Sequence, residues 1–140
     1  MNIKEYIKDH ILILDGGMGT LLQAQGLLPG ELPERWNLTH PDVITKIHLN
    51  YYNAGSNVVN TNTFGASILK FSPVELDAIV KAAIQNARAA ACACVGDHPR
   101  FVALDIGPTG RMLRPYGDFD FEEAVSVHNG DFPYYIDCLA

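Results

Sequence analysis

The feature that most constrains the fold is a short apolar run that ends in a polar, glycine-rich loop, and it occurs three times. The runs with their loops are residues 11–14 (ILIL) with 15–20 (DGGMGT), 57–60 (NVVN) with 61–65 (TNTFG), and 101–104 (FVAL) with 105–110 (DIGPTG). Short apolar runs are typical of strands that are covered on both faces of a parallel sheet. We therefore expect three strands, each followed by a polar loop.

The segments between these runs have helical periodicity and recognisable ends. Segment 41–54 opens with a proline and stops at a glycine, with apolar residues at helical spacing between them. Segment 72–95 opens with Ser72-Pro73-Val74-Glu75, a capping box. A third helix is predicted to start at Asp120. Strands that alternate with helices are joined by right-handed crossovers, so all three loops should lie at one end of the sheet.

Two architectures fit this order. The strand starts, at residues 11, 57 and 101, are spaced so that eight units would need roughly 360 residues, the size of an elaborated (β/α)8 barrel. The sequence then predicts an α/β fold that is the N-terminal portion of a TIM barrel, with about three βα units. The alternative is a small, non-catalytic metabolite-binding domain with an open doubly wound sheet, although only three strands are identifiable. In both architectures ligands bind at the carboxyl ends of the strands.

Composition excludes several classes of function. The formal charge is −6, and the ten lysines and arginines are scattered singly, so we expect no nucleic-acid partner and no anionic membrane surface. The longest apolar runs fall far short of the ~20 residues that cross a bilayer, and the N-terminus does not have the order of a secretory signal. A cytoplasmic location is therefore expected. Three cysteines form no disulfide framework.

The first loop offers the groups that an amino acid needs. Asp15 follows the first run directly, and its carboxylate could hold an ammonium group. Gly16 and Gly17 lack side chains, so their backbone amides could approach a ligand carboxylate closely. The alternative is that this glycine pair forms only a tight turn.

The second and third loops carry further polar candidates. Thr61, Asn62 and Thr63 point alternately to the two faces of their strand, so some should face the ligand; alternatively they satisfy backbone groups of the loops. Asp105 is either a second carboxylate that faces the ligand or a cap for the following turn.

The remaining metal-ligating residue types show no ligand spacing. Cys92 and Cys94 lie two apart on the predicted helix, where their side chains diverge by ~200°, and they are interpreted as packing residues. The five histidines match no metal motif and are interpreted as structural or exposed. Trp36 is interpreted as a packing anchor for its loop.

Taken together, five segments in the expected order resemble the homocysteine S-methyltransferase family. They are residues 13–20 (ILDGGMGT), 36–44 (WNLTHPDVI), 54–66 (AGSNVVNTNTFGA), 103–110 (ALDIGPTG) and 115–124 (PYGDFDFEEA). The last two resemble in particular the N-terminal, homocysteine-binding module of cobalamin-dependent methionine synthase.

The resemblance implies a (β/α)8 barrel that transfers a methyl group to the thiol of homocysteine, which a zinc ion activates, to give methionine. The methyl donor would be methylcobalamin, carried by further modules, or in other branches betaine or S-methylmethionine. Carried over to this sequence, Asp15 would hold the homocysteine amino group, and Gly16 and Gly17 would offer amides to its carboxylate. Residues 61–63 would line the same pocket.

The sequence also departs from the family. The zinc ligands of such enzymes are a cysteine near a later strand and a Cys-Cys pair near the last strand, and Cys92, Cys94 and Cys138 match neither position. The second acidic partner of the amino group, which follows the fourth strand, is missing as well. Metal ligands are therefore not expected in this chain.

We thus divide the chain into a partial homocysteine-binding domain, residues 1–125, and an atypical tail, residues 126–140. Asn129-Gly130 is a turn signal, and Pro133 should interrupt a helix. The hypothesis is an N-terminal part of a barrel that has a non-native end and is inactive alone.

Overall fold

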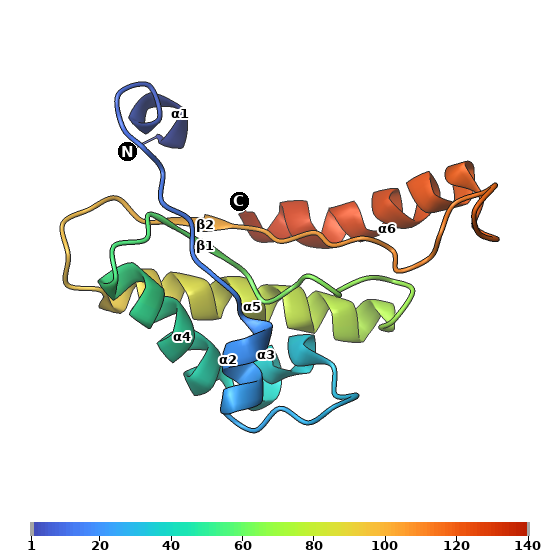
Figure 1. Ribbon diagram of the computed structural model, residues 1–140, viewed down its shortest axis with the longest axis horizontal. Coiled ribbons are helices and arrows are strands. Elements are labelled where there is room, and N and C mark those ends of the chain that lie inside the picture. The colour runs from blue at the N-terminus through green and yellow to red at the C-terminus, as the bar shows by residue number, and fades with distance from the viewer. Residues whose placement is uncertain (1, 140) are drawn as a thin grey trace.

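The computed structural model describes residues 2–139, and it describes side chains as far as residue 130. Two short parallel strands form a small sheet, and helices pack against one side of it (Figure 1). The elements in order are α1 (Ile3–Tyr6), α2 (Gly19–Ala24), the 3-10 helix η1 (Pro33–Arg35), α3 (Trp36–Thr39), α4 (Pro41–Asn53), β1 (Val58–Asn60), α5 (Pro73–Ala93), β2 (Phe101–Ala103) and α6 (Phe121–Leu139).

The sheet contains two of the three predicted strands. β1 and β2 pair in parallel, with Val58 opposite Phe101 and Asn60 opposite Ala103. The run at residues 11–14 makes only an isolated parallel bridge, between Leu14 and Val58. The expectation of a strand covered on both faces is therefore wrong for this run, in which Leu14 is 58% exposed. A run pairs fully only where neighbours lie alongside it, and here contact with β1 begins only near the end of the run.

Both long helices that were predicted between the runs are confirmed, as α4 and α5. α4 is followed by Gly55 at φ +103°, a left-handed conformation that favours glycine. α5 begins at Pro73, and the hydroxyl of Ser72 accepts a hydrogen bond from the Glu75 backbone at 3.3 Å. The second half of the capping box is absent, because the Glu75 carboxylate accepts a 2.7 Å hydrogen bond from Arg35 instead.

Ser72→Ala should lower the free energy of unfolding by about 1 kcal/mol, the usual effect of removing an N-cap side chain. The first turn of α5 then loses the acceptor for the Glu75 N–H. Urea denaturation measures the change. Ser126→Ala, on the exposed side of α6, is the matched control and should change stability by less than about 0.5 kcal/mol. Equal stability of the two variants would contradict the capping role.

Three apolar clusters join the helices to the strands. One places Val59 of β1 against Tyr52 of α4 and Ala87 of α5, so these two helices cover one side of the sheet. A second contains Trp36 with residues of α2 and α4, which confirms Trp36 as a packing residue. The third, around Ile79 of α5, also packs against Leu104, directly before the third polar loop. The clusters thus fix the three loops relative to one another.

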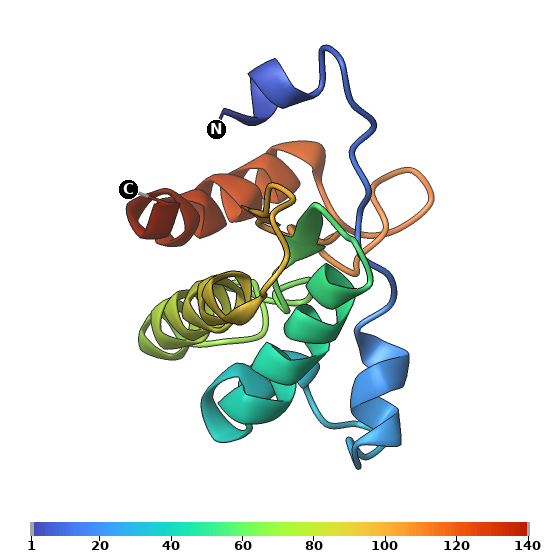
Figure 2. The ribbon, with the colours of Figure 1, turned by 90° about the vertical axis from the view of Figure 1, so that its left-hand side faces the viewer.

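The predicted interruption of the last helix is wrong. α6 begins at Phe121, as Asp120 indicated, and runs to Leu139 beside α5 (Figure 2). Both Gly130 and Pro133 lie inside it. A proline removes one backbone hydrogen bond from a helix, and a glycine weakens it, but neither makes a helix impossible when the surrounding residues favour one. Among the described residues, no helix combines the length and apolar character that crossing a membrane requires.

Candidate functional site

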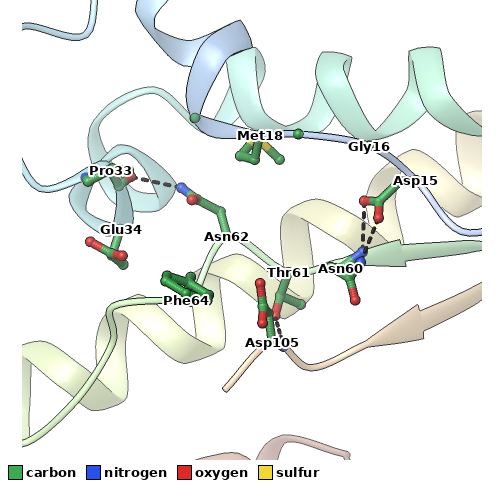
Figure 3. A pocket seen from close by; sticks show the side chains of 12 residues that line it. Asp15, Gly16, Met18, Pro33, Glu34, Asn60, Thr61, Asn62, Phe64 and Asp105 are labelled. Atoms are coloured by element: carbon green, nitrogen blue, oxygen red, sulfur yellow. Dashed lines mark hydrogen bonds between the residues drawn. The ribbon is translucent and has the colours of Figure 1, made fainter. Parts of the chain in front are cut away.

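The three polar loops meet around one cavity at the carboxyl ends of the strands. Its volume is about 320 Å³, and Figure 3 shows its walls. The lining residues come from all three loops and from η1: Asp15, Gly16, Gly17, Met18, Gly19, Pro33, Glu34, Asn60, Thr61, Asn62, Phe64 and Asp105. Loops that are up to 90 residues apart in sequence, from Asp15 to Asp105, therefore build one site.

The carboxylate of Asp15 is held in one orientation by Asn60 (Figure 3). Its Oδ2 accepts the backbone N–H of Asn60 at 2.8 Å, and its Oδ1 accepts the side-chain amide of Asn60 at 2.6 Å. An ionised carboxylate has about four lone-pair positions, so acceptor positions remain for a ligand. The half-buried Asp15 is thus a fixed hydrogen-bond acceptor at the cavity wall.

The glycines after Asp15 leave hydrogen-bond donors at the same wall. Among the residues that the structure describes, the N–H groups of Gly16 and Gly17 have no hydrogen-bond partner. The hydroxyl of Tyr51 donates to the carbonyl oxygen of Gly17 at 3.0 Å. A Cβ on Gly16 would lie 2.9 Å from that hydroxyl, so glycine is needed there for the close approach of Tyr51. The result is a loop of fixed shape with free amides.

A second carboxylate, that of Asp105, reaches the cavity from the loop after β2. It accepts no hydrogen bond from any described residue. Its backbone is held instead: Thr63 donates to its carbonyl oxygen at 2.7 Å, and its N–H donates to the hydroxyl of Thr61 at 3.2 Å. Asp105 therefore lines the cavity, and its carboxylate caps no turn among the described residues.

The fourth wall of the cavity comes from η1, which is hydrogen-bonded to the loop after β1. The side chain of Asn62 donates to the Pro33 carbonyl at 2.8 Å (Figure 3), and the side chain of Asn37 donates to the Asn62 carbonyl at 2.7 Å. The buried carboxylate of Glu34 accepts the Gly65 N–H at 2.7 Å. These bonds explain why polar side chains at the end of β1 are buried.

The electrostatics of the cavity favour a cation. Burial raises the pKa of Asp15 above 3.8, against the opposing effect of the hydrogen bonds from Asn60. Burial also raises the pKa of Asp105, and the negative charge of Asp15 raises it further. An ammonium group beside these carboxylates would stabilise the charged form of both. Free amides beside half-buried carboxylates are the donor and acceptor set that an α-amino acid requires.

The two cysteines whose side chains the structure describes take no part in this site. Cys92 is exposed on α5, and Cys94 is buried in the cluster with Tyr52 and Val59, while the side chain of Cys138 lies outside the described residues. Within the described part of the chain, no group of three or more His, Cys, Asp or Glu side chains could hold a metal ion. His48 is fully buried with neither ring nitrogen hydrogen-bonded, and burial lowers its pKa to about 4, as suits a structural histidine.

The structure brings six of the seven predicted site residues to one cavity. Asp15, Gly16, Gly17, Thr61, Asn62 and Asp105 line it, whereas the fully buried Thr63 does not. Sequence reasoning missed Asn60 and Glu34 as members of the site. The position of Asn60, at the end of its strand and next to Thr61, was the available signal for that residue. Nothing local to Glu34 indicates its role.

The arrangement defines an α/β protein with a cavity of about 320 Å³, lined in part by carboxylates and free backbone amides, at the ends of parallel strands. Its fold matches three solved structures of the homocysteine methyltransferase MmuM from Escherichia coli. The oxidized form has a TM-score of 0.80 and 22% identity over 97% of this chain and 53% of that chain. The metallated form has a TM-score of 0.79 and is 21% identical, over 97% of this chain and 54% of that chain. The apo form has a TM-score of 0.72 and is 24% identical, over 94% of this chain and 48% of that chain.

Residues 12–138 match the sequence model of the family described as homocysteine S-methyltransferase. A methionine synthase from Mycobacterium tuberculosis (strain ATCC 25618 / H37Rv) is 30% identical over 131 residues, which cover 86% of this chain and 11% of that protein. The chain therefore belongs to the homocysteine S-methyltransferase family. It spans about half the length of the matching solved structures and a ninth of the methionine synthase.

Proposed function

We propose that this chain forms the amino-acid-binding part of a homocysteine S-methyltransferase, a module that transfers a methyl group to homocysteine to give methionine. One observation carries the proposal: a fixed carboxylate at Asp15 and two free backbone amides at Gly16 and Gly17 line the same cavity. The membership of the family supports homocysteine as the amino acid, and it favours this reading over the open doubly wound domain.

In the proposed complex the ammonium group and the carboxylate of the amino acid are bound by different residues of the cavity. The ammonium group donates to Asp15, and Asp105 supplies a second negative charge to it. The ligand carboxylate accepts from the N–H groups of Gly16 and Gly17. Charge-assisted hydrogen bonds of this kind are shorter and stronger than neutral ones. The thiol then points away from these groups toward the open side of the cavity.

The described residues do not fit the zinc ion that the family resemblance implies, because they contain no group of ligands for it. Thiol activation, and the choice among methylcobalamin, betaine and S-methylmethionine as methyl donor, belong to residues outside the described site. On this proposal the chain alone binds homocysteine without turnover.

We further propose that β1, β2 and the run at residues 11–14, with the helices that follow them, are the N-terminal portion of a (β/α)8 barrel. The parallel pairing of β1 with β2, and the bridge from Leu14 to Val58, support this. In a barrel each strand has neighbours on both sides. The outer edge of β2 and the run at residues 11–14 would be the places where further strands pair.

Calorimetric titration of the full chain with L-homocysteine tests the proposed function. Two comparison ligands separate the two ends of the amino-acid group: 4-mercaptobutanoate lacks the amino group, and 3-mercaptopropylamine lacks the carboxylate. Homocysteine should bind at least about tenfold more tightly than either one, because each loses charge-assisted hydrogen bonds. Equal affinity for all three thiols, or no binding of homocysteine, would contradict the proposal.

The affinity for homocysteine should fall on acidification at a higher pH than an ordinary aspartate would cause. Binding of the ammonium group requires ionised carboxylates, and burial raises the pKa of both Asp15 and Asp105 above 3.8. Affinity is therefore retained above the raised pKa values and lost as the pH falls through them. Titrations between about pH 7 and about pH 4, with circular dichroism to verify folding, measure this loss. Constant affinity over the range would rule out the two carboxylates as the ammonium site.

A further inference from the structure

Where the pairing of β1 and β2 ends, two buried threonine hydroxyls take over the role of backbone hydrogen bonds. Thr61 is 2% exposed and Thr63 is 0% exposed, and their Oγ1 atoms lie 2.7 Å apart. The Thr61 hydroxyl accepts the Asp105 N–H at 3.2 Å, and the Thr63 hydroxyl donates to the Asp105 carbonyl oxygen at 2.7 Å. Both backbone polar groups of Asp105 are thus bonded to hydroxyls.

These contacts determine the direction of every hydrogen bond. A carbonyl oxygen only accepts, so the hydrogen of Thr63 is committed to Asp105. The bond between the two hydroxyls must then be donated by Thr61. The result is a closed ring that runs from the Asp105 N–H through Thr61 and Thr63 back to the Asp105 carbonyl. Bonds in such a ring polarise one another, so replacing either hydroxyl weakens the whole ring.

The ring fixes the backbone of Asp105, whose carboxylate lines the cavity. The Asp105 carboxylate lines the cavity without a hydrogen bond from any described residue, so its position depends on its backbone. The neighbouring backbone is closely packed: a Cβ on Gly107 would lie 2.0 Å from the Phe64 carbonyl oxygen. Figure 3 shows Thr61 next to Asp105 on one side of the cavity, with Asp15 on another.

We propose that Thr63, together with Thr61, is a positioning residue that holds the Asp105 backbone, and so its carboxylate, at the cavity for the ammonium group of the substrate. Thr63 itself does not line the cavity. The identity of the ligand rests on the proposed function, whereas the ring of hydrogen bonds does not. Of the two readings that the sequence left open for Thr63, its contacts agree with the one in which the hydroxyl satisfies a backbone group of a loop.

The test compares Thr63→Val, which keeps the shape and removes the hydroxyl, with Thr63→Ser, which keeps the hydroxyl. Calorimetry on the full chain should give homocysteine affinity about tenfold weaker for Thr63→Val and within about twofold of the unaltered protein for Thr63→Ser. In Thr63→Val the loss of homocysteine affinity on acidification should also occur at lower pH. A released Asp105 carboxylate is more exposed to solvent, which removes part of the burial that raises its pKa. A purely structural role of Thr63 would leave the pH of this loss unchanged.

Amide hydrogen exchange of the unaltered protein gives a readout that needs neither a variant nor a ligand. The Asp105 N–H should exchange at least about tenfold more slowly than the N–H of Ile106, which has no partner among the described residues. Equal exchange of the two amides, or equal affinity and pH profile in Thr63→Val and Thr63→Ser, overturns the proposal. If homocysteine fails to bind the unaltered protein, the proposed function fails, while the protection of the Asp105 amide and its loss in Thr63→Val still test the ring.

Discussion

Asp15→Asn should weaken homocysteine binding by about 10- to 100-fold, the range expected when a charge-assisted hydrogen bond is lost. The substitution keeps the size of the side chain but removes the charge that faces the ammonium group. It also places an NH2 group against one of the two Asn60 donors. Both effects act on the Asp15 carboxylate, the group on which the proposed function depends most. Calorimetry with L-homocysteine measures the loss.

Two comparisons make this result specific. Asp9→Asn makes the same change of charge at an exposed position that does not line the cavity, and it should leave the affinity unaltered. The deamino ligand 4-mercaptobutanoate should bind Asp15→Asn and the unaltered protein with similar affinity, because it has no ammonium group to lose. Coupling between the variant and the amino group of the ligand is then measured directly. If both ligands lose affinity equally, Asp15 supports the loop and does not bind the ammonium group.

Ile79→Ala should lower the free energy of unfolding by about 2–5 kcal/mol, the range for truncating a large, fully buried aliphatic side chain. Ile79 is 0% exposed in the cluster that joins α5 to Phe71 and to Leu104. The cost combines lost apolar burial with the cavity that remains. Urea denaturation followed by circular dichroism measures it.

Val74→Ala is the matched control on the same helix. Val74 is 83% exposed, so its truncation should change the free energy of unfolding by less than about 0.5 kcal/mol. Equal effects of the two variants would show that the face of α5 that carries Ile79 is not packed in solution. Because Leu104 directly precedes Asp105, Ile79→Ala should also loosen that side of the cavity.

The helices were predictable from sequence because the signals that start and stop them are local. Ser72 and Gly55 act on their own turns, and they mark α5 and α4 where the structure has them. The run at residues 11–14 was predicted as a strand from its apolar residues alone. Pairing depends on neighbours that a local pattern does not contain, and in this run only the end acquires them, at the bridge from Leu14 to Val58. The turn signal at Asn129-Gly130 failed for the converse reason, since local preference yielded to the helix around it.

The members of the site were predictable where topology alone places them. Asp15 and Asp105 follow parallel runs, so they had to approach the same end of the sheet. The role of Asn60 depends on its contact with Asp15, 45 positions away, and that of Glu34 on its contact with Gly65, 31 positions away. No sequence pattern near Asn60 or Glu34 encodes such a contact. The same holds for Thr63, whose partner is the backbone of Asp105.

The pair of hydrogen bonds from Asn60 to Asp15 separates the entropic cost of ordering the Asp15 side chain from the cost of binding a ligand. Fixing the rotamer of a side chain reduces its entropy, and in most flexible sites that loss falls on the complex with the ligand. Here the protein orders the carboxylate when it folds. The entropic penalty is therefore part of the folding equilibrium, and association with a ligand begins from a recognition group that is already immobilised.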